Sequence, residues 1–258
     1  MSPAQALIPS AIWGAMPEIC TAEQADFRTA SQRDGTAKVT AFLSPDELGE
    51  LRSAVDATYD LLRQHADDDP PTLTGYLADH YKRWDGIWIK ELRGYLERVR
   101  PDLLAQFDRV IAAAERRFRE LFDQNWRLEP NFTFVRRHRS TRKYLPWHID
   151  ADAAGIINAT DYCINTWLPL DPVGDVLPSL ELILGSNKAM RNIPSVEGSE
   201  KSRPDDWVKS NIGGESWIPH AVPGDAILFD HWTLHRTQRM LRDDVMRTSC
   251  EFRFVRTS

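Results

Sequence analysis

Cysteine is scarce in this chain, and the few that occur are poorly placed for pairing. There are three, Cys20, Cys163 and Cys250, and no two of them form a Cys-x-x-Cys motif. An odd number of widely separated cysteines argues against a disulfide framework and against a zinc site made of thiolates. We therefore expect the protein to work in the reducing cytoplasm.

Long apolar runs and an excess of positive charge are also missing. No stretch approaches the roughly 20 apolar residues that cross a bilayer, and the N-terminus lacks the basic segment of a signal peptide. The formal net charge is −6, which gives no general attraction to nucleic acid or to an anionic membrane. A small-molecule substrate is the expected partner, and the sequence leaves the oligomeric state open.

The composition is that of an ordinary globular protein, with 42% hydrophobic and 27% charged residues in 258. We expect one domain over residues 1–258, with a mostly helical part at 1–125 and a strand-rich core at 126–258. In the first part, Ser44 and Glu47 have the spacing of a capping box, which predicts a helix start. A second start is predicted at Pro101, and residues 76–99 are also expected to be mostly helical.

Short strand-like runs follow Asn125 and are separated by turn signals rich in Gly, Pro and Asp. They cover 132–135, 163–168, 180–184, 226–229 and 249–254. Helices followed by many short strands predict a mainly β fold with α, a β-sandwich or jelly roll with helices packed on it. The polar stretch 186–216 lacks periodicity and is expected to be a lid or binding loop.

The first candidate site is His148-Ile149-Asp150. At a strand or its end, residues two apart lie on the same side, so His148 and Asp150 can point at one ion. A bare His-x-Asp also fits a surface histidine beside an N-capping aspartate. With His235 added, the set matches the two-histidine, one-carboxylate triad that holds non-haem Fe(II) and leaves coordination positions open. His231 is the rival second histidine.

Arg247 follows His235 by twelve residues, and this spacing favours His235 over His231. A guanidinium buried in a barrel needs a partner, and a carboxylate is its best geometric match. Arg242 and Arg253 are alternatives to Arg247. Thr237 can add a hydroxyl to the same carboxylate. If these residues act together, the chain is an oxygenase.

From about residue 130 onward, the chain resembles the phytanoyl-CoA dioxygenase-like family of Fe(II)/2-oxoglutarate-dependent oxygenases. The matching pieces, in order, are Leu145-Pro146-Trp147-His148-Ile149-Asp150, the run Trp167–Asp171, Gly224-Asp225 leading to Phe229, His235-Arg236-Thr237, and Arg247. The resemblance implies a double-stranded β-helix, a cupin-like jelly roll, buttressed by N-terminal helices. It also implies iron as cofactor and 2-oxoglutarate and O2 as co-substrates.

By this resemblance, His148, Asp150 and His235 bind iron and are catalytic. Arg247 binds the distal carboxylate of 2-oxoglutarate with help from Thr237, and Trp167 borders the co-substrate. The implied reaction hydroxylates an unactivated C–H bond of a small molecule, with secondary metabolites among the candidates, and releases succinate and CO2. Related halogenases have a small residue in place of the carboxylate, so Asp150 favours hydroxylation.

The chain departs from the family pattern at two places. Leu184-Gly185-Ser186-Asn187 stands where the family often has Pro-Gly-Ser-His, and Ile149 stands where it often has Gln. Ile149 cannot form a hydrogen bond through its side chain, so another residue must hold the near carboxylate of 2-oxoglutarate. Asn165 and Asn131 are the candidates.

Two other classes of function stay open at this point. A cupin-like hydrolase or isomerase would use the metal triad without 2-oxoglutarate and would not need Arg247. A non-catalytic jelly-roll module would instead bind sugar or peptide in a tryptophan-rich mouth near Trp147, Trp217 and Trp232. Substrate selectivity is expected from residues 76–90 and 186–216.

Overall fold

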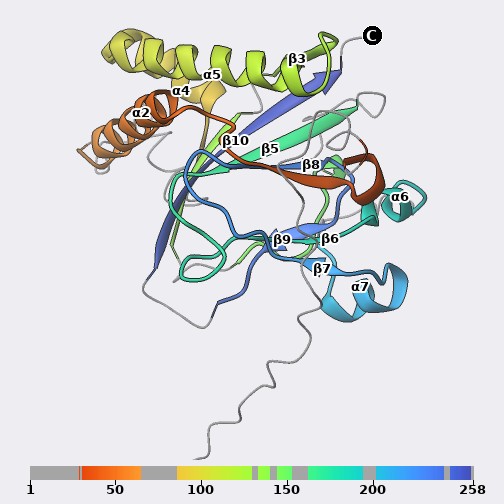
Figure 1. Cartoon of the computed structure of the whole chain (residues 1–258). Helices are drawn as coiled ribbons and strands as arrows, with labels where there is room; N and C mark the ends of the chain where they lie inside the picture. Colours follow the sequence, from red (N-terminus) through yellow and green to blue (C-terminus); the bar gives the residue numbers. More distant parts are fainter. Residues whose placement is uncertain are drawn as a thin grey trace, which may run out of the picture.

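Two antiparallel sheets face each other in the computed structural model (Figure 1). The structure describes residues 29, 31–64, 86–129, 133–139, 144–152, 162–193, 202–240 and 245–256. The order of the larger, seven-stranded sheet is β1 (Thr36–Val39), β8 (Ala226–Asp230), β5 (Cys163–Pro169), β10 (Met246–Arg256), β4 (Phe134–Arg139) and β2 (Gly86–Trp88), with β3 (Trp126–Leu128) paired to β10. The smaller sheet has the order β7 (Ser216–Trp217), β6 (Leu180–Ile183) and β9 (His235–Thr237).

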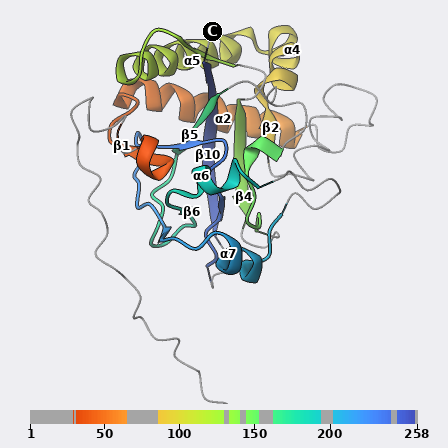
Figure 2. The ribbon, with the colours of Figure 1, turned by 90° about the vertical axis from the view of Figure 1, so that its right-hand side faces the viewer.

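Three helices cover the outer face of the larger sheet, on the side away from the smaller one (Figures 1 and 2). They are α2 (Pro45–Gln64), α4 (Ile89–Val99) and α5 (Pro101–Leu121). The predicted capping box begins α2: the Ser44 amide donates to Glu47 Oε2 at 2.9 Å, and the Glu47 amide donates to Ser44 Oγ at 3.3 Å. The predicted start at Pro101 is likewise the first residue of α5.

Strand β10 divides its side chains between the two layers. Cys250, Phe252 and Phe254 belong to the core packed against the helices, whereas Arg247, Ser249, Glu251 and Arg253 line a cavity between the sheets. This two-residue alternation is the one predicted for 249–254. It places a row of polar side chains inside the barrel because the opposite face of the strand supplies the apolar core.

The predicted mainly β fold with helices is confirmed, but some of its parts differ from the prediction. Residues 76–99 were expected to be mostly helical, and this is wrong at β2, where Gly86–Trp88 pair with β4. Residues 65–85 lie outside the described residues. The stretch 186–216, expected to be an irregular loop, contains the short helices α6 (Ser186–Met190) and α7 (Asp205–Asn211) as well as β7.

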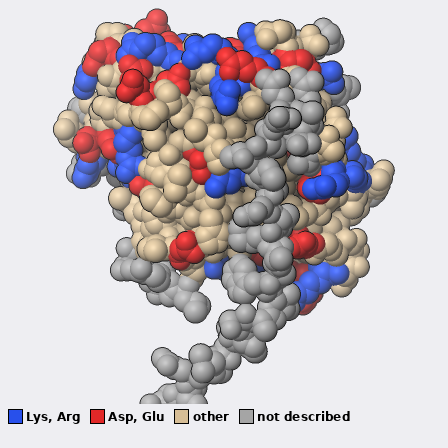
Figure 3. Space-filling view, in the orientation of Figure 1, with Lys and Arg blue, Asp and Glu red and all other residues tan. Residues whose placement is uncertain are grey.

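Charges of both signs are mixed over the helical layer in the face shown in Figure 3. Ion pairs connect its helices, with Arg109 of α5 on Glu50 of α2 and Arg116 of α5 on Glu47 of α2. Among the described residues, none of the helices combines the length and the apolar character required to span a membrane.

Candidate metal centre

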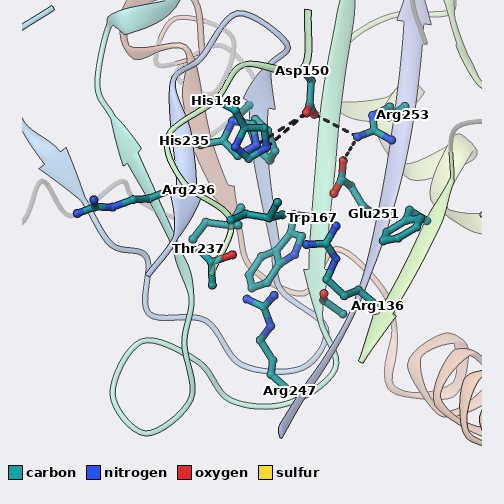
Figure 4. Close-up of a pocket in the computed structure, with 15 residues that line it drawn as sticks. Arg136, His148, Asp150, Trp167, His235, Arg236, Thr237, Arg247, Glu251 and Arg253 are labelled. Carbon is teal, nitrogen blue, oxygen red and sulfur yellow. Dashed lines mark hydrogen bonds and ion pairs between the residues drawn. The ribbon is translucent and has the colours of Figure 1, made fainter. Parts of the chain in front are cut away.

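His148, Asp150 and His235 converge on one point between the sheets (Figure 4). One potential ligand atom from each lies within 4.8 Å of the others. Asp150 Oδ1 is 3.8 Å from His148 Nε2 and 4.0 Å from His235 Nε2. Two imidazoles and one carboxylate at this spacing are a suitable ligand set for a divalent transition metal.

The backbone brings the two histidines together. The amide of His148 donates to the carbonyl of His235 at 2.9 Å, and the amide of His235 donates to the carbonyl of His148 at 3.0 Å. In such an antiparallel bridge, directly opposite side chains lie on the same face, and the two rings are 4.2 Å apart between centroids. Asp150 begins a single 3-10 turn, Asp150–Asp152, two residues after His148.

Hydrogen bonds at the far side of each ring orient its metal-facing nitrogen. His148 Nδ1 lies 2.8 Å from the Pro146 carbonyl, and His235 Nδ1 lies 2.9 Å from the Thr233 carbonyl. A carbonyl only accepts, so each Nδ1 carries the proton, and each Nε2 presents its lone pair to the point that Asp150 Oδ1 also faces. Burial lowers the pKa of both rings, that of His148 to about 4. Both imidazoles are therefore neutral near pH 7, as metal ligands must be.

Asp150 is held from behind by a pair of side chains. Its Oδ2 accepts hydrogen bonds from Asn165 Nδ2 at 2.7 Å and from Arg253 Nη2 at 3.2 Å, while Arg253 Nε donates to Asn165 Oδ1 at 3.0 Å. Burial alone would raise the pKa of Asp150, but Arg253 and the two histidines hold it well below its usual value. Oδ1 of an ionised carboxylate is thus left facing the histidines.

Arg247 lies at the other end of the cavity. It is 2% exposed, its Nη1 donates to the Pro178 carbonyl at 2.8 Å, and its guanidinium lies 4.9 Å from the centroid of the Trp167 ring. Within the described residues, Nε has no hydrogen-bond partner and no carboxylate forms an ion pair with the side chain. Burial, and then repulsion from Arg136, lowers the pKa of Arg247 to about 9. A buried cation without a counter-ion is suited to receive an anionic ligand.

The cavity between these ends has a volume of about 70 Å³, which is room for several water molecules. Six of the seven residues predicted for the site line it: His148, Asp150, Trp167, His235, Thr237 and Arg247. Asn165 does not, because its amide is turned to Asp150 and Arg253. Its predicted role toward 2-oxoglutarate has no direct support in this arrangement and stays a prediction.

The rival residues lie elsewhere. His231 Nδ1 is 2.9 Å from the Cys163 carbonyl, and the residue is outside the metal-ligand group. Arg253 supports Asp150 and does not lie beside Arg247. Trp217 packs in the core between the sheets, and Trp147 donates through Nε1 to Asp205 at 2.8 Å. Two further candidates, Arg242 and Asn131, are outside the described part of the chain.

Arg136 and Glu251 also line the cavity and were not among the predicted site residues. Burial raises the pKa of Glu251, which faces Arg253 at 2.5 Å. The alternation of side chains along a strand could have found both, because residues two or four positions apart lie on the same face. By that rule Arg136 shares a face of β4 with Phe134, and Glu251 shares a face of β10 with Arg247. Parity alone does not say which face is the inner one.

The model of the family described as phytanoyl-CoA dioxygenase (PhyH) matches residues 31–248 of this chain. The chain belongs to the phytanoyl-CoA dioxygenase family. That membership agrees with the triad and with the resemblance seen in the sequence. The predicted iron agrees with His148, Asp150 and His235, which could hold a metal ion, and the predicted dioxygenase class agrees with the family. No curated protein sequence matches the chain.

Several solved structures are similar to this phytanoyl-CoA dioxygenase family member. The epimerase SnoN in complex with Fe3+, alpha ketoglutarate and nogalamycin RO has 16% identity and a TM-score of 0.58, covering 90% of this chain and 83% of its own. EvdO2 from Micromonospora carbonacea var. aurantiaca, complexed with 2-oxoglutarate, has 15% identity, a TM-score of 0.55 and coverage of 90% of each chain. EctD from S. alaskensis, with 2-oxoglutarate and 5-hydroxyectoine, has 16% identity and a TM-score of 0.59, covering 89% of this chain and 74% of its own. At these identities the likeness shows the fold, and the predicted double-stranded β-helix is confirmed.

Proposed function

We propose that this protein is an Fe(II)/2-oxoglutarate-dependent dioxygenase that hydroxylates an unactivated C–H bond of a small molecule. One observation carries the proposal: the triad shares its cavity with Arg247, a buried guanidinium without a carboxylate partner among the described residues. The triad alone fits many metal enzymes, whereas Arg247 adds a receptor for a carboxylate at a distance from the metal. 2-Oxoglutarate joins these two requirements in one molecule.

His148, Asp150 and His235 would hold the iron through His148 Nε2, Asp150 Oδ1 and His235 Nε2. Bound iron and 2-oxoglutarate supply the oxidising chemistry, with the co-substrate leaving as succinate and CO2. The protein's own residues bind, orient and exclude water. Arg247 would bind the distal carboxylate, with the Thr237 hydroxyl beside it and the face of Trp167 covering one side. The carboxylate of Asp150 occupies the position that a halide would need, which favours hydroxylation.

A binding measurement without turnover tests the proposal. Metal-free protein is mixed anaerobically with Fe(II) and 2-oxoglutarate, and the weak visible charge-transfer band of the chelate is recorded. We expect a band in the parent, its loss in His235→Gln, and its retention in His231→Gln, because His231 lies outside the ligand group. Arg247→Gln should weaken 2-oxoglutarate about 10- to 100-fold, the usual loss when a charge-assisted bidentate contact is removed.

The alternatives predict other results. A hydrolase or isomerase that binds metal alone would give iron binding but no band, and a non-catalytic module would bind neither iron nor 2-oxoglutarate. A parent protein without the band rules out the oxygenase proposal. Product analysis must then separate hydroxylation from epimerisation, since an epimerase is among the similar structures.

A further inference from the structure

Arg136 is a second cation of the cavity that forms no ion pair with a carboxylate of the described residues. It lies on β4 and lines the cavity. Figure 4 shows its guanidinium between the guanidinium of Arg247 and the carboxylate of Glu251. Among the described residues, none provides its guanidinium with a hydrogen bond or an ion pair, and the guanidinium carbon lies 5.0 Å from the centroid of the Phe134 ring. Burial lowers its pKa, and the charges of Glu251 and Asp150 offset only part of that effect.

The other arginines of this region are satisfied. Arg236 is paired with Glu181 at 2.7 Å, and Arg253 is paired with Asp150 at 3.2 Å. Arg137, the next residue of β4, faces the helical layer, where it forms an ion pair with Asp56. Only Arg136 and Arg247 combine a place in the described cavity with the lack of a carboxylate partner. Burial of an unpaired cation is costly, so each of these two positions is suited to an anion.

The register of β4 on β10 sets the spacing of these two cations. His138 is opposite Arg247, Arg136 is opposite Ser249, and Phe134 is opposite Glu251. Arg136 therefore lies two residues along the strand from the level of Arg247, on the same cavity-facing side, which is a distance of roughly 7 Å. The step runs toward Glu251 and Arg253, which is the end where Arg253 holds Asp150. A dicarboxylate that spans from Arg247 to the triad passes Arg136 on its way.

We propose that Arg136 binds the near carboxylate of 2-oxoglutarate, the one beside the keto group. The inference rests on the proposed function and assigns a role that the chain otherwise leaves open. Ile149 has no side-chain donor for this carboxylate, and the amide of Asn165 is engaged by Asp150 and Arg253. The competing ligand for Arg136 is an anionic group of the primary substrate.

A comparison of two ligands separates these cases. 2-Oxopentanoate keeps the keto group and the near carboxylate of 2-oxoglutarate but lacks the distal one. Both ligands are titrated anaerobically into the Fe(II)-loaded protein, without primary substrate, and the charge-transfer band and the Kd are measured. The proteins are the parent, Arg136→Gln, Arg247→Gln and the control Arg137→Gln, whose side chain lies on the opposite face of the same strand.

We expect Arg136→Gln to weaken both ligands by the same factor, about 10- to 100-fold. Arg247→Gln should weaken 2-oxoglutarate alone, down to the affinity of 2-oxopentanoate. Arg137→Gln should leave both dissociation constants unchanged. Arg136→Lys, which keeps the charge and loses the bidentate geometry, should weaken both ligands by a smaller and equal factor.

Three results overturn the inference. If the parent forms the band and Arg136→Gln binds both ligands as the parent does, Arg136 serves the primary substrate. If the variant loses affinity for 2-oxoglutarate alone, Arg136 belongs to the distal carboxylate. If Arg136→Gln no longer binds Fe(II), both ligands are titrated into Arg136→Lys instead. A loss of affinity for only one of the two ligands in that variant contradicts the assignment. A parent without any band rejects the proposed function itself.

Discussion

Asp150 and Arg247 show how single residues in one cavity are given opposite electrostatic surroundings. Asp150 receives two hydrogen bonds from Asn165 and Arg253, so its charge is supported before any metal binds. Arg247 has one carbonyl and the face of Trp167, and no described carboxylate. The first arrangement suits a fixed metal ligand and the second suits a site that binds an exchangeable anion.

The support behind Asp150 can be tested with Asn165→Leu. Removal of the amide leaves Asp150 Oδ2 with Arg253 as its partner, and the carboxylate is then less firmly oriented. We expect iron affinity to fall about 10- to 100-fold, the usual effect of losing such an outer partner, as measured by anaerobic Fe(II) titration. The control is Asn192→Ala, an exposed side chain on the carbonyl of Lys188. Unchanged iron affinity in Asn165→Leu would show that Arg253 alone positions Asp150.

At the scale of elements, the strands position the site, and hydrogen bonds hold the short helix α7 beside it. Asp205, at the start of α7, accepts hydrogen bonds from Trp147 Nε1 at 2.8 Å, Arg236 Nη1 at 2.5 Å and Arg239 Nη1 at 2.8 Å. Trp147 directly precedes His148, and Arg236 directly follows His235. One carboxylate therefore joins α7 to both backbone segments that carry the histidines.

Asp205→Ala should release α7 from these segments. The variant leaves Trp147 and Arg236 with fewer partners and removes the charge that holds the first turn of the helix. We expect faster limited cleavage by trypsin at Lys209, which is exposed on α7. Asp206→Ala, an exposed neighbour on the same helix, should be cleaved at the rate of the parent. Equal rates in both variants would mean that the apolar contacts of α7 suffice to hold it.

The alternation and spacing of apolar residues predicted the central strands of the sheets better than the short strands at the edges of the larger sheet. The runs 163–168 and 226–229 lie wholly in strands, and 180–184 does so up to Ile183, because each is bounded by turn residues and rich in buried apolar side chains. Strands β1 and β2 are short segments from the helical half that gain their structure by pairing with β8 and β4. Local sequence does not contain that pairing, so tertiary contact overrides the helical tendency around residues 86–88.

Across the whole molecule, the helical layer keeps the larger sheet in shape. Phe118 of α5 stacks on Phe254 of β10, with ring centroids 3.9 Å apart and both side chains fully buried. β10 is the strand that carries Arg247, Glu251 and Arg253 on its other face. The packing of helices outside the sheet and the placement of charges inside it thus depend on the same strand.

Phe254→Ala should destabilise the protein by about 3–5 kcal/mol, because it removes a buried ring and leaves a cavity beside Phe118. Urea unfolding of the metal-free protein measures the change. Phe254→Leu is the matched variant and should cost clearly less, since it keeps most of the apolar volume. A loss below about 1 kcal/mol in Phe254→Ala would mean that α5 closes onto the sheet without this contact.

The sequence by itself determined the mainly β fold with helices and the group of residues worth testing. His-x-Asp, a later His and a following Arg are properties of residue type and spacing, and they can be recognised in one dimension. The spacing to Arg247 favoured His235 over His231, but only the tertiary structure placed His235 beside His148 and Asp150, turned Asn165 to Asp150, and faced Arg136 to the cavity. Those outcomes depend on which face of each strand is turned inward and on which side chains meet across the barrel, and spacing along the chain does not encode either.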